Sequence, residues 1–103
     1  MIQRKSDLGR LQDSAGQAAA LLRAVGNPQR LLVLCLLISE GEMSVGALND
    51  KVPLSPSALS QHLARMREKG LVAYRREAQT LYYRIEDPSV AKLVATLKDI
   101  FCP

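Results

Sequence analysis

The spacing of apolar residues divides the chain into five helical segments and one β-hairpin. Apolar positions recur every three or four residues from about Leu11 or Ser14 to Val25, which predicts a first amphipathic helix. Residues 31–38 are apolar on every side of a helix, so the second helix is predicted to be the buried centre of the fold. Residues 1–10 are expected to be frayed.

Short polar residues predict where the later helices begin. Asn27-Pro28, Ser55-Pro56 and Asp87-Pro88 are each typical of a helix start, because the first side chain caps free backbone N–H groups and proline needs no such partner there. Ser44 is expected to cap a short third helix. The fourth helix is expected to end at Gly70, since glycine readily adopts the conformation that terminates a helix.

The hairpin is predicted where β-branched and aromatic residues gather. Residues 72–76 and 80–85 have this composition and flank the short segment 77–79. The order helix, helix, tight turn, helix and hairpin predicts a winged helix-turn-helix. This fold is mostly α, with five helices and a two-stranded wing, and one domain is expected over residues 1–103.

The fourth predicted helix has two faces of different chemistry. Its apolar face, which we expect in the core, carries Leu59, Leu63 and Met66. Its polar face carries Ser57, Ser60, Gln61 and Arg65. Short residues let a helix enter the major groove of DNA, glutamine can pair with adenine, and arginine can pair with guanine or phosphate. An ordinary solvated helix face is the alternative interpretation.

The positions of the charged residues support DNA binding more strongly than the net charge does. The net charge is +4, and six of the fourteen lysines and arginines lie between residues 65 and 84, opposed there only by Glu68 and Glu77. The residues at or near the tip of the predicted wing are Arg75, Arg76, Gln79 and Thr80. A protruding, basic hairpin suits contact with phosphates or the minor groove, although a charged turn is the alternative.

Three motifs resemble the ArsR/SmtB family of bacterial winged-helix repressors. They are Pro28-Gln29-Arg30-Leu31, the string Ser57-Ala58-Leu59-Ser60-Gln61-His62-Leu63, and Leu71-Val72 before the arginine-rich wing. The resemblance extends from residue 14 over nearly the whole chain. It implies a homodimer, built from the first and last helices, that binds an inverted repeat in double-stranded DNA until an inducer releases it. It also adds His62 to the expected DNA-binding residues, although its place beside the core face favours a structural role.

The residues themselves also favour a dimer. Both the first helix and the last helix carry a broad apolar stripe, and a domain of this size has little core left to cover them. Pairing these helices with those of a second copy would bury both stripes. The alternative is that both stripes pack on the second helix of the same subunit.

The inducer is the least determined feature. Residues 42–48 contain no cysteine and the last helix contains no histidine, so neither metal-binding pattern of the family is present, and we expect no metal or other cofactor. What remains is Cys35 on the second helix and Cys102 after the last. From the residues alone, these are either two unrelated thiols or a redox couple. With residues 17–22 and 101–103, they resemble the BigR, YgaV and HlyU branch, which implies sensing of persulfides or oxidants.

Some alternatives remain open and others are disfavoured. A metal-responsive repressor using both cysteines, or a DNA-binding antirepressor without a sensor, would fit the same fold. An enzyme is not expected, because neither cysteine has an adjacent histidine and there is no glycine-rich loop. No secretory signal or membrane span is expected, which predicts a cytoplasmic protein. The apolar surroundings of Cys35 should raise its pKa, with Arg23 or Arg30 as candidates to offset that effect.

Overall fold

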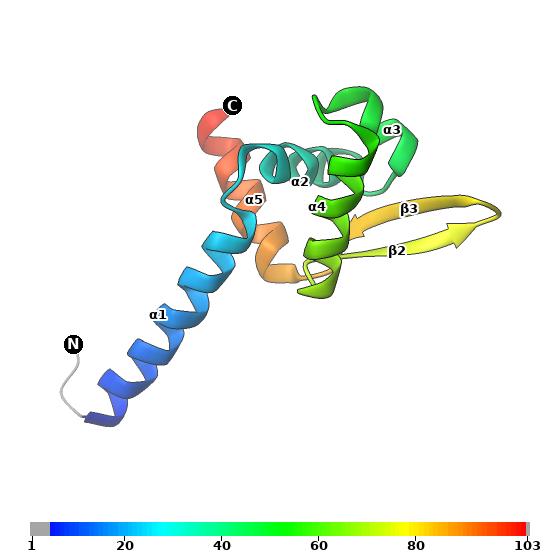
Figure 1. The fold of residues 1–103 in the computed structure, drawn as a ribbon. Helices are drawn as coiled ribbons and strands as arrows, with labels where there is room; N and C mark the ends of the chain where they lie inside the picture. The colour runs from blue at the N-terminus through cyan, green and yellow to red at the C-terminus, as the bar shows by residue number, and fades with distance from the viewer. Residues whose placement is uncertain (1–4, 103) are drawn as a thin grey trace.

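The computed structural model describes residues 5–102, which form five helices and three strands. The helices are α1 (Lys5–Val25), α2 (Pro28–Glu40), α3 (Val45–Lys51), α4 (Pro56–Glu68) and α5 (Pro88–Phe101). The strands are β1 (Met43–Ser44), β2 (Val72–Glu77) and β3 (Thr80–Ile85). The expected winged helix-turn-helix is confirmed, because α3 and α4 form the helix-turn-helix and β2 and β3 form the wing (Figure 1).

Helix α1 begins earlier than the apolar pattern indicates. It starts at Lys5, so residues 5–10, which we expected to be frayed, lie within the helix; residues 1–4 lie outside the described part of the chain. Asp7 lies in its first turn, where a carboxylate interacts favourably with the helix dipole. Arg10 donates a 2.7 Å hydrogen bond to Asp7, one turn away. Leu8 continues the apolar stripe one turn before Leu11, and these polar contacts accompany the extension of the helix.

The predicted caps are present at the start of four helices. The Asn27 side chain accepts hydrogen bonds from two backbone N–H groups of α2 at 3.0 and 3.2 Å. Ser44, Ser55 and Asp87 cap α3, α4 and α5 in the same way. At the other end of α4, Gly70 has a positive φ of 74° and directs the chain into the wing. Local sequence therefore sets most of the helix boundaries.

The sheet has one strand more than expected. Its order is β1-β3-β2, with antiparallel pairing throughout, and β1 pairs with β3 through Met43 opposite Tyr83. A strand of two residues carries no recognisable alternation, so its existence depends on the partner strand. In the wing itself, Glu77 pairs with Thr80 and the turn is shortened to two residues, with Ala78 at a φ of 55°.

The core lies between α2, α4, α5 and the base of the wing. Leu59, Leu63 and Met66 are buried, so the predicted apolar face of α4 is confirmed. Helix α2 contributes Val33, Leu34 and Leu37 to the same core. It is not buried on every side as predicted, because Leu32 is exposed and Cys35 is only half-buried. One side of α2 thus remains open to solvent within a single subunit.

The molecule is more extended than its length requires. Figure 1 shows α1 projecting away from the body on one side, while the wing projects on another. The radius of gyration is 15.9 Å, against roughly 13 Å for a compact domain of this length. Within the described residues, no single helix is long and apolar enough to cross a membrane. Asp7–Val25 and α2 together have the length and composition of a membrane span, but the two helices meet at an angle of 91°.

Candidate nucleic-acid interface and cysteine pair

Helix α4 presents the expected polar face to solvent. The turn before it is held by Asn49, whose side-chain amide donates a 2.9 Å hydrogen bond to the carbonyl oxygen of Leu54. With the core face anchored below, the four predicted contact residues are exposed on the outside of the helix: Ser57, Ser60, Gln61 and Arg65. Sequence periodicity was sufficient to predict this exposed face, because the helical repeat fixes which residues lie opposite the buried ones.

His62 has a defined structural partner. The Arg30 side chain on α2 donates a 3.0 Å hydrogen bond through Nε to His62 Nδ1, and a 2.9 Å bond through Nη1 to the carbonyl oxygen of Ala24. Burial lowers the pKa of His62, and the nearby charges of Arg30 and Arg65 lower it further. One arginine therefore joins the end of α1, the start of α2 and the middle of α4.

The wing separates its two adjacent arginines. Successive residues of a strand point to opposite faces, so Arg75 and Arg76 lie on different sides of the hairpin. Arg76, Gln79 and Thr80 are exposed at its distal end. Within residues 5–102, no ion pair involves Arg76, so its charge is available to an external anion.

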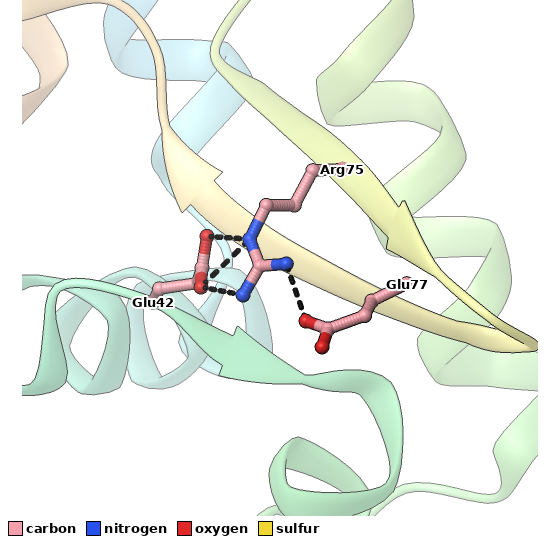
Figure 2. Close-up of polar contacts among 3 residues, drawn as sticks. All are labelled: Glu42, Arg75 and Glu77. Carbon is pink, nitrogen blue, oxygen red and sulfur yellow. Dashed lines mark hydrogen bonds and ion pairs between the residues drawn. The ribbon is translucent and has the colours of Figure 1, made fainter.

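Arg75 is instead engaged with two carboxylates of its own chain. Figure 2 shows its guanidinium between Glu42 and Glu77, with Nε and Nη2 donating to Glu42 at 2.8 to 3.1 Å and Nη1 donating to Glu77 at 2.7 Å. It also lies over the Tyr82 ring, 4.4 Å from the centroid. These hydrogen bonds raise the pKa of Arg75, and the bond from Arg75 lowers that of Glu42. Sequence analysis missed Glu42, which precedes β1 and is 33 residues away.

A groove separates the wing from the helix-turn-helix. Its volume is about 600 Å³ and it is open to solvent. Ser60 from α4 and Gln79 and Thr80 from the wing lie along it. Arg67 lines it too, with its guanidinium carbon 5.0 Å from the centre of the Tyr74 ring. The groove thus brings together polar residues that sequence analysis had assigned separately to the helix and to the wing.

The two cysteines belong to neighbouring elements. Cys35 lies on α2 and is half-buried, Cys102 follows α5 and is exposed, and both are free thiols. Burial raises the pKa of Cys35, as the sequence predicted; a charge on Cys102 raises it further, whereas the charge of Lys98 lowers it. The compensating cation is therefore Lys98. Neither of the expected candidates, Arg23 and Arg30, is among the charges that shift the pKa of Cys35, and Arg30 is engaged with Ala24 and His62.

Lys98 joins the two elements that carry the thiols. Its ammonium donates a hydrogen bond to the Ser39 hydroxyl of α2. Sequence analysis did not identify either residue, because Ser39 and Lys98 are 59 residues apart and meet only when α2 and α5 pack together. In the part of the chain that the structure describes, no group of three or more His, Cys, Asp and Glu residues could hold a metal ion.

Comparison with known proteins places this arrangement in a family. Residues 27–74 match the model of the bacterial regulatory proteins of the arsR family. The chain is 49% identical to the HTH-type transcriptional regulator YgaV of Escherichia coli over 98 residues, which covers 95% of this chain and 99% of the relative. The chain belongs to the ArsR family. Its expected class, a helix-turn-helix transcriptional regulator and not an enzyme, is therefore confirmed.

Other ArsR-family similarities extend over most of the chain. The chain is 41% identical to the transcriptional activator HlyU of Vibrio cholerae, over 93% of its own length and 88% of the relative. Among solved structures, the transcriptional repressor BigR of Xylella fastidiosa superimposes with a TM-score of 0.82 at 37% identity, covering 91% of this chain and 92% of that one. The ArsR-family fold is thus shared along with the sequence.

Proposed function

We propose that this ArsR-family chain is a homodimeric repressor that binds an inverted repeat in double-stranded DNA and is released when Cys35 and Cys102 react with persulfides or related oxidants. The main observation that supports this proposal is the placement of the two thiols. They lie on α2 and at the end of α5, two elements joined by the contact between Ser39 and Lys98. The relative BigR is named a transcriptional repressor, which supports repression, whereas the relative HlyU is named a transcriptional activator.

The DNA contact follows from the exposed residues of α4 and the wing. Ser57, Ser60 and Gln61 are positioned to meet base edges in the major groove, while Arg65 and Arg76 suit phosphates. Gln79 and Thr80 would contact the backbone or the minor groove at the tip of the wing.

The dimer follows from the uncovered stripe of α1. Leu8, Leu11 and Leu22 are each about half exposed, and with Ala15 and Ala18 they follow alternating spacings of three and four residues. This is the spacing of a coiled-coil seam. Helix α5 divides its apolar stripe, because Val90 and Val94 are buried in the subunit's own core whereas Ile100 and Phe101 are exposed. A second copy would cover what the first leaves open.

The sensing reaction needs only the two thiols and a persulfide. The Cys35 thiolate attacks the outer sulfur of R–S–SH, forms a new S–S bond and releases R–S⁻. The Cys102 thiolate then attacks the Cys35 sulfur and expels HS⁻, so the two cysteines are oxidised to a disulfide while the transferred sulfur is reduced to sulfide. If Cys102 also carries an added sulfur, the same attack gives a trisulfide and HS⁻. Either bridge would tie α2 to α5 and shift the dimer relative to its two recognition helices.

The experiment uses duplex DNA selected by the reduced protein from a random pool. Glutathione persulfide should release the DNA and give an intramolecular bridge by mass spectrometry, and reduction should restore binding. Cys35→Ser and Cys102→Ser should each bind the DNA but ignore the persulfide. An inducible Cys102→Ser variant would contradict the mechanism, and release by Zn(II) under reducing conditions would favour the metal-responsive alternative.

A further inference from the structure

A second pair of polar residues lies on the same two elements as the cysteine pair. On α2, Cys35 and Ser39 are one turn apart; at the end of α5, Lys98 and Cys102 are also one turn apart. The Lys98 ammonium reaches across to the Ser39 hydroxyl, and the Cys102 backbone N–H donates a 2.7 Å hydrogen bond to the Lys98 carbonyl oxygen. The charges of both Lys98 and Cys102 act on Cys35, so this end of α5 lies near the Cys35 thiol.

The charged groups that act on the Cys35 thiol both come from this end of α5. A Cys102 thiolate opposes ionisation of Cys35 and raises its pKa, adding to the effect of burial, whereas the Lys98 ammonium favours the thiolate and lowers that pKa. Helix α2 itself presents the neutral Ser39 hydroxyl beside Lys98.

We infer that Lys98 is the residue that activates the cysteine sensor, by holding its ammonium beside Cys35 through the hydrogen bond to Ser39. This inference rests on the proposed sensing function. The ammonium stabilises the Cys35 thiolate before it attacks the persulfide. It then stabilises the negative charge that leaves as R–S⁻ and later as HS⁻, so both steps occur beside the same cation.

The hydrogen bond to Ser39 explains why Lys98 can act on Cys35 despite its flexible side chain. A lysine free in solvent samples many rotamers, and a hydrogen bond to a fixed acceptor restricts it to those that point toward α2. The neighbouring basic residue of α5, Lys92, is exposed and lies six residues earlier in the helix, so it offers a matched change of charge away from the thiols.

The test compares Lys98→Met with Lys92→Met, both in a Cys102→Ser background so that Cys35 is the only thiol. The rate of Cys35 alkylation by neutral iodoacetamide is followed against pH by mass spectrometry. Lys98→Met should move the midpoint to higher pH and slow alkylation at pH 7 roughly three- to tenfold, since each unit of pKa changes the thiolate fraction about tenfold. Lys98→Arg should restore most of the rate, and Lys92→Met should match the background.

As a control for correct folding, the DNA affinity and the unfolding midpoint of each reduced variant are measured. Lys98→Gln replaces Lys98→Met if the latter does not fold. Identical pH profiles for Lys98→Met and Lys92→Met would overturn the inference. The alkylation rate does not depend on persulfide chemistry, so the two proposals fail separately. If glutathione persulfide does not release DNA from the unmodified protein, the proposed function fails whatever the alkylation profiles show.

Discussion

At the scale of single residues, two adjacent arginines of the wing have different electrostatic environments. Arg75 is held by Glu42 and Glu77, whereas within residues 5–102 no carboxylate pairs with Arg76. An arginine that is already neutralised releases few counterions from DNA, because binding a phosphate would require it to give up its carboxylates. The two side chains therefore provide a matched comparison of the same substitution at neighbouring positions.

Arg76→Ala should weaken binding to every DNA sequence and reduce the slope of log K against log salt by about one. Arg75→Ala should leave that slope almost unchanged. DNA titrations at four or more salt concentrations measure both slopes. If Arg75→Ala flattens the slope as much as Arg76→Ala does, the Arg75 pairing seen in Figure 2 does not persist on DNA.

The bond between Arg30 and His62 should make stability depend on pH. Neutral His62 accepts from Arg30 through Nδ1, and protonation of that atom removes the acceptor. The folded protein has a lowered His62 pKa, so the unfolded chain binds the proton more readily. The stabilisation is therefore complete above the unfolded value of 6.5 and is lost as pH falls through the lowered pKa.

His62→Asn retains an acceptor near the Nδ1 position and does not titrate. Between pH 7.5 and 5.5 the wild-type protein should lose more unfolding free energy than the variant does, as measured by urea denaturation at each pH. Parallel curves for the two proteins would show that the bond to Arg30 contributes nothing to the pH dependence.

At the scale of elements, α4 and the wing should divide the work of DNA recognition. Gln61 lies on the exposed face of α4, and Gln79 is exposed at the wing tip, so the same substitution can test both elements. Gln61→Ala should reduce discrimination between the selected DNA and single-base variants by about 1–3 kcal/mol at the contacted position. Gln79→Ala should weaken binding to all DNA sequences by the same factor. Competition binding against a panel of base substitutions distinguishes these outcomes, and equal discrimination by both variants would mean that α4 is not the reading element.

At the scale of the whole molecule, α1 is an arm that its own subunit does not cover. Among its described apolar residues only Ala24 and Val25 are buried, both at its C-terminal end. Such an arm is costly to leave exposed, since burying apolar surface is worth about 25 cal/mol per Å². This is the physical reason for placing α1 at the proposed dimer interface.

Leu11→Glu should weaken the dimer by at least tenfold, because it places a charge within the apolar stripe of α1. Gln17→Glu adds the same charge on the exposed opposite side of the helix and should leave the dimer intact. Sedimentation equilibrium measures the dimer dissociation constant of each variant. The DNA affinity of Leu11→Glu should fall as its dimer becomes weaker. A Leu11→Glu protein that remains as dimeric as the Gln17→Glu control would place the interface elsewhere.

The sequence by itself determined the features that depend on neighbouring residues. The caps at Asn27, Ser44, Ser55 and Asp87 were predictable because each contact spans two or three residues. The buried face of α4 was predictable because helical periodicity alone separates its apolar and polar sides. Together these local signals were enough to establish the order of elements, and hence the fold class.

Only the tertiary structure decided which distant residues meet. The pairing of Arg75 with Glu42 and the contact of Lys98 with Ser39 span 33 and 59 residues. Strand β1 exists only because β3 lies beside it. Such contacts depend on the register and crossing of packed elements, which small differences in packing change without altering any local pattern. Local chemistry therefore identified the two cysteines and the two wing arginines, whereas packing decided which arginine is paired with Glu42 and which cation acts on Cys35.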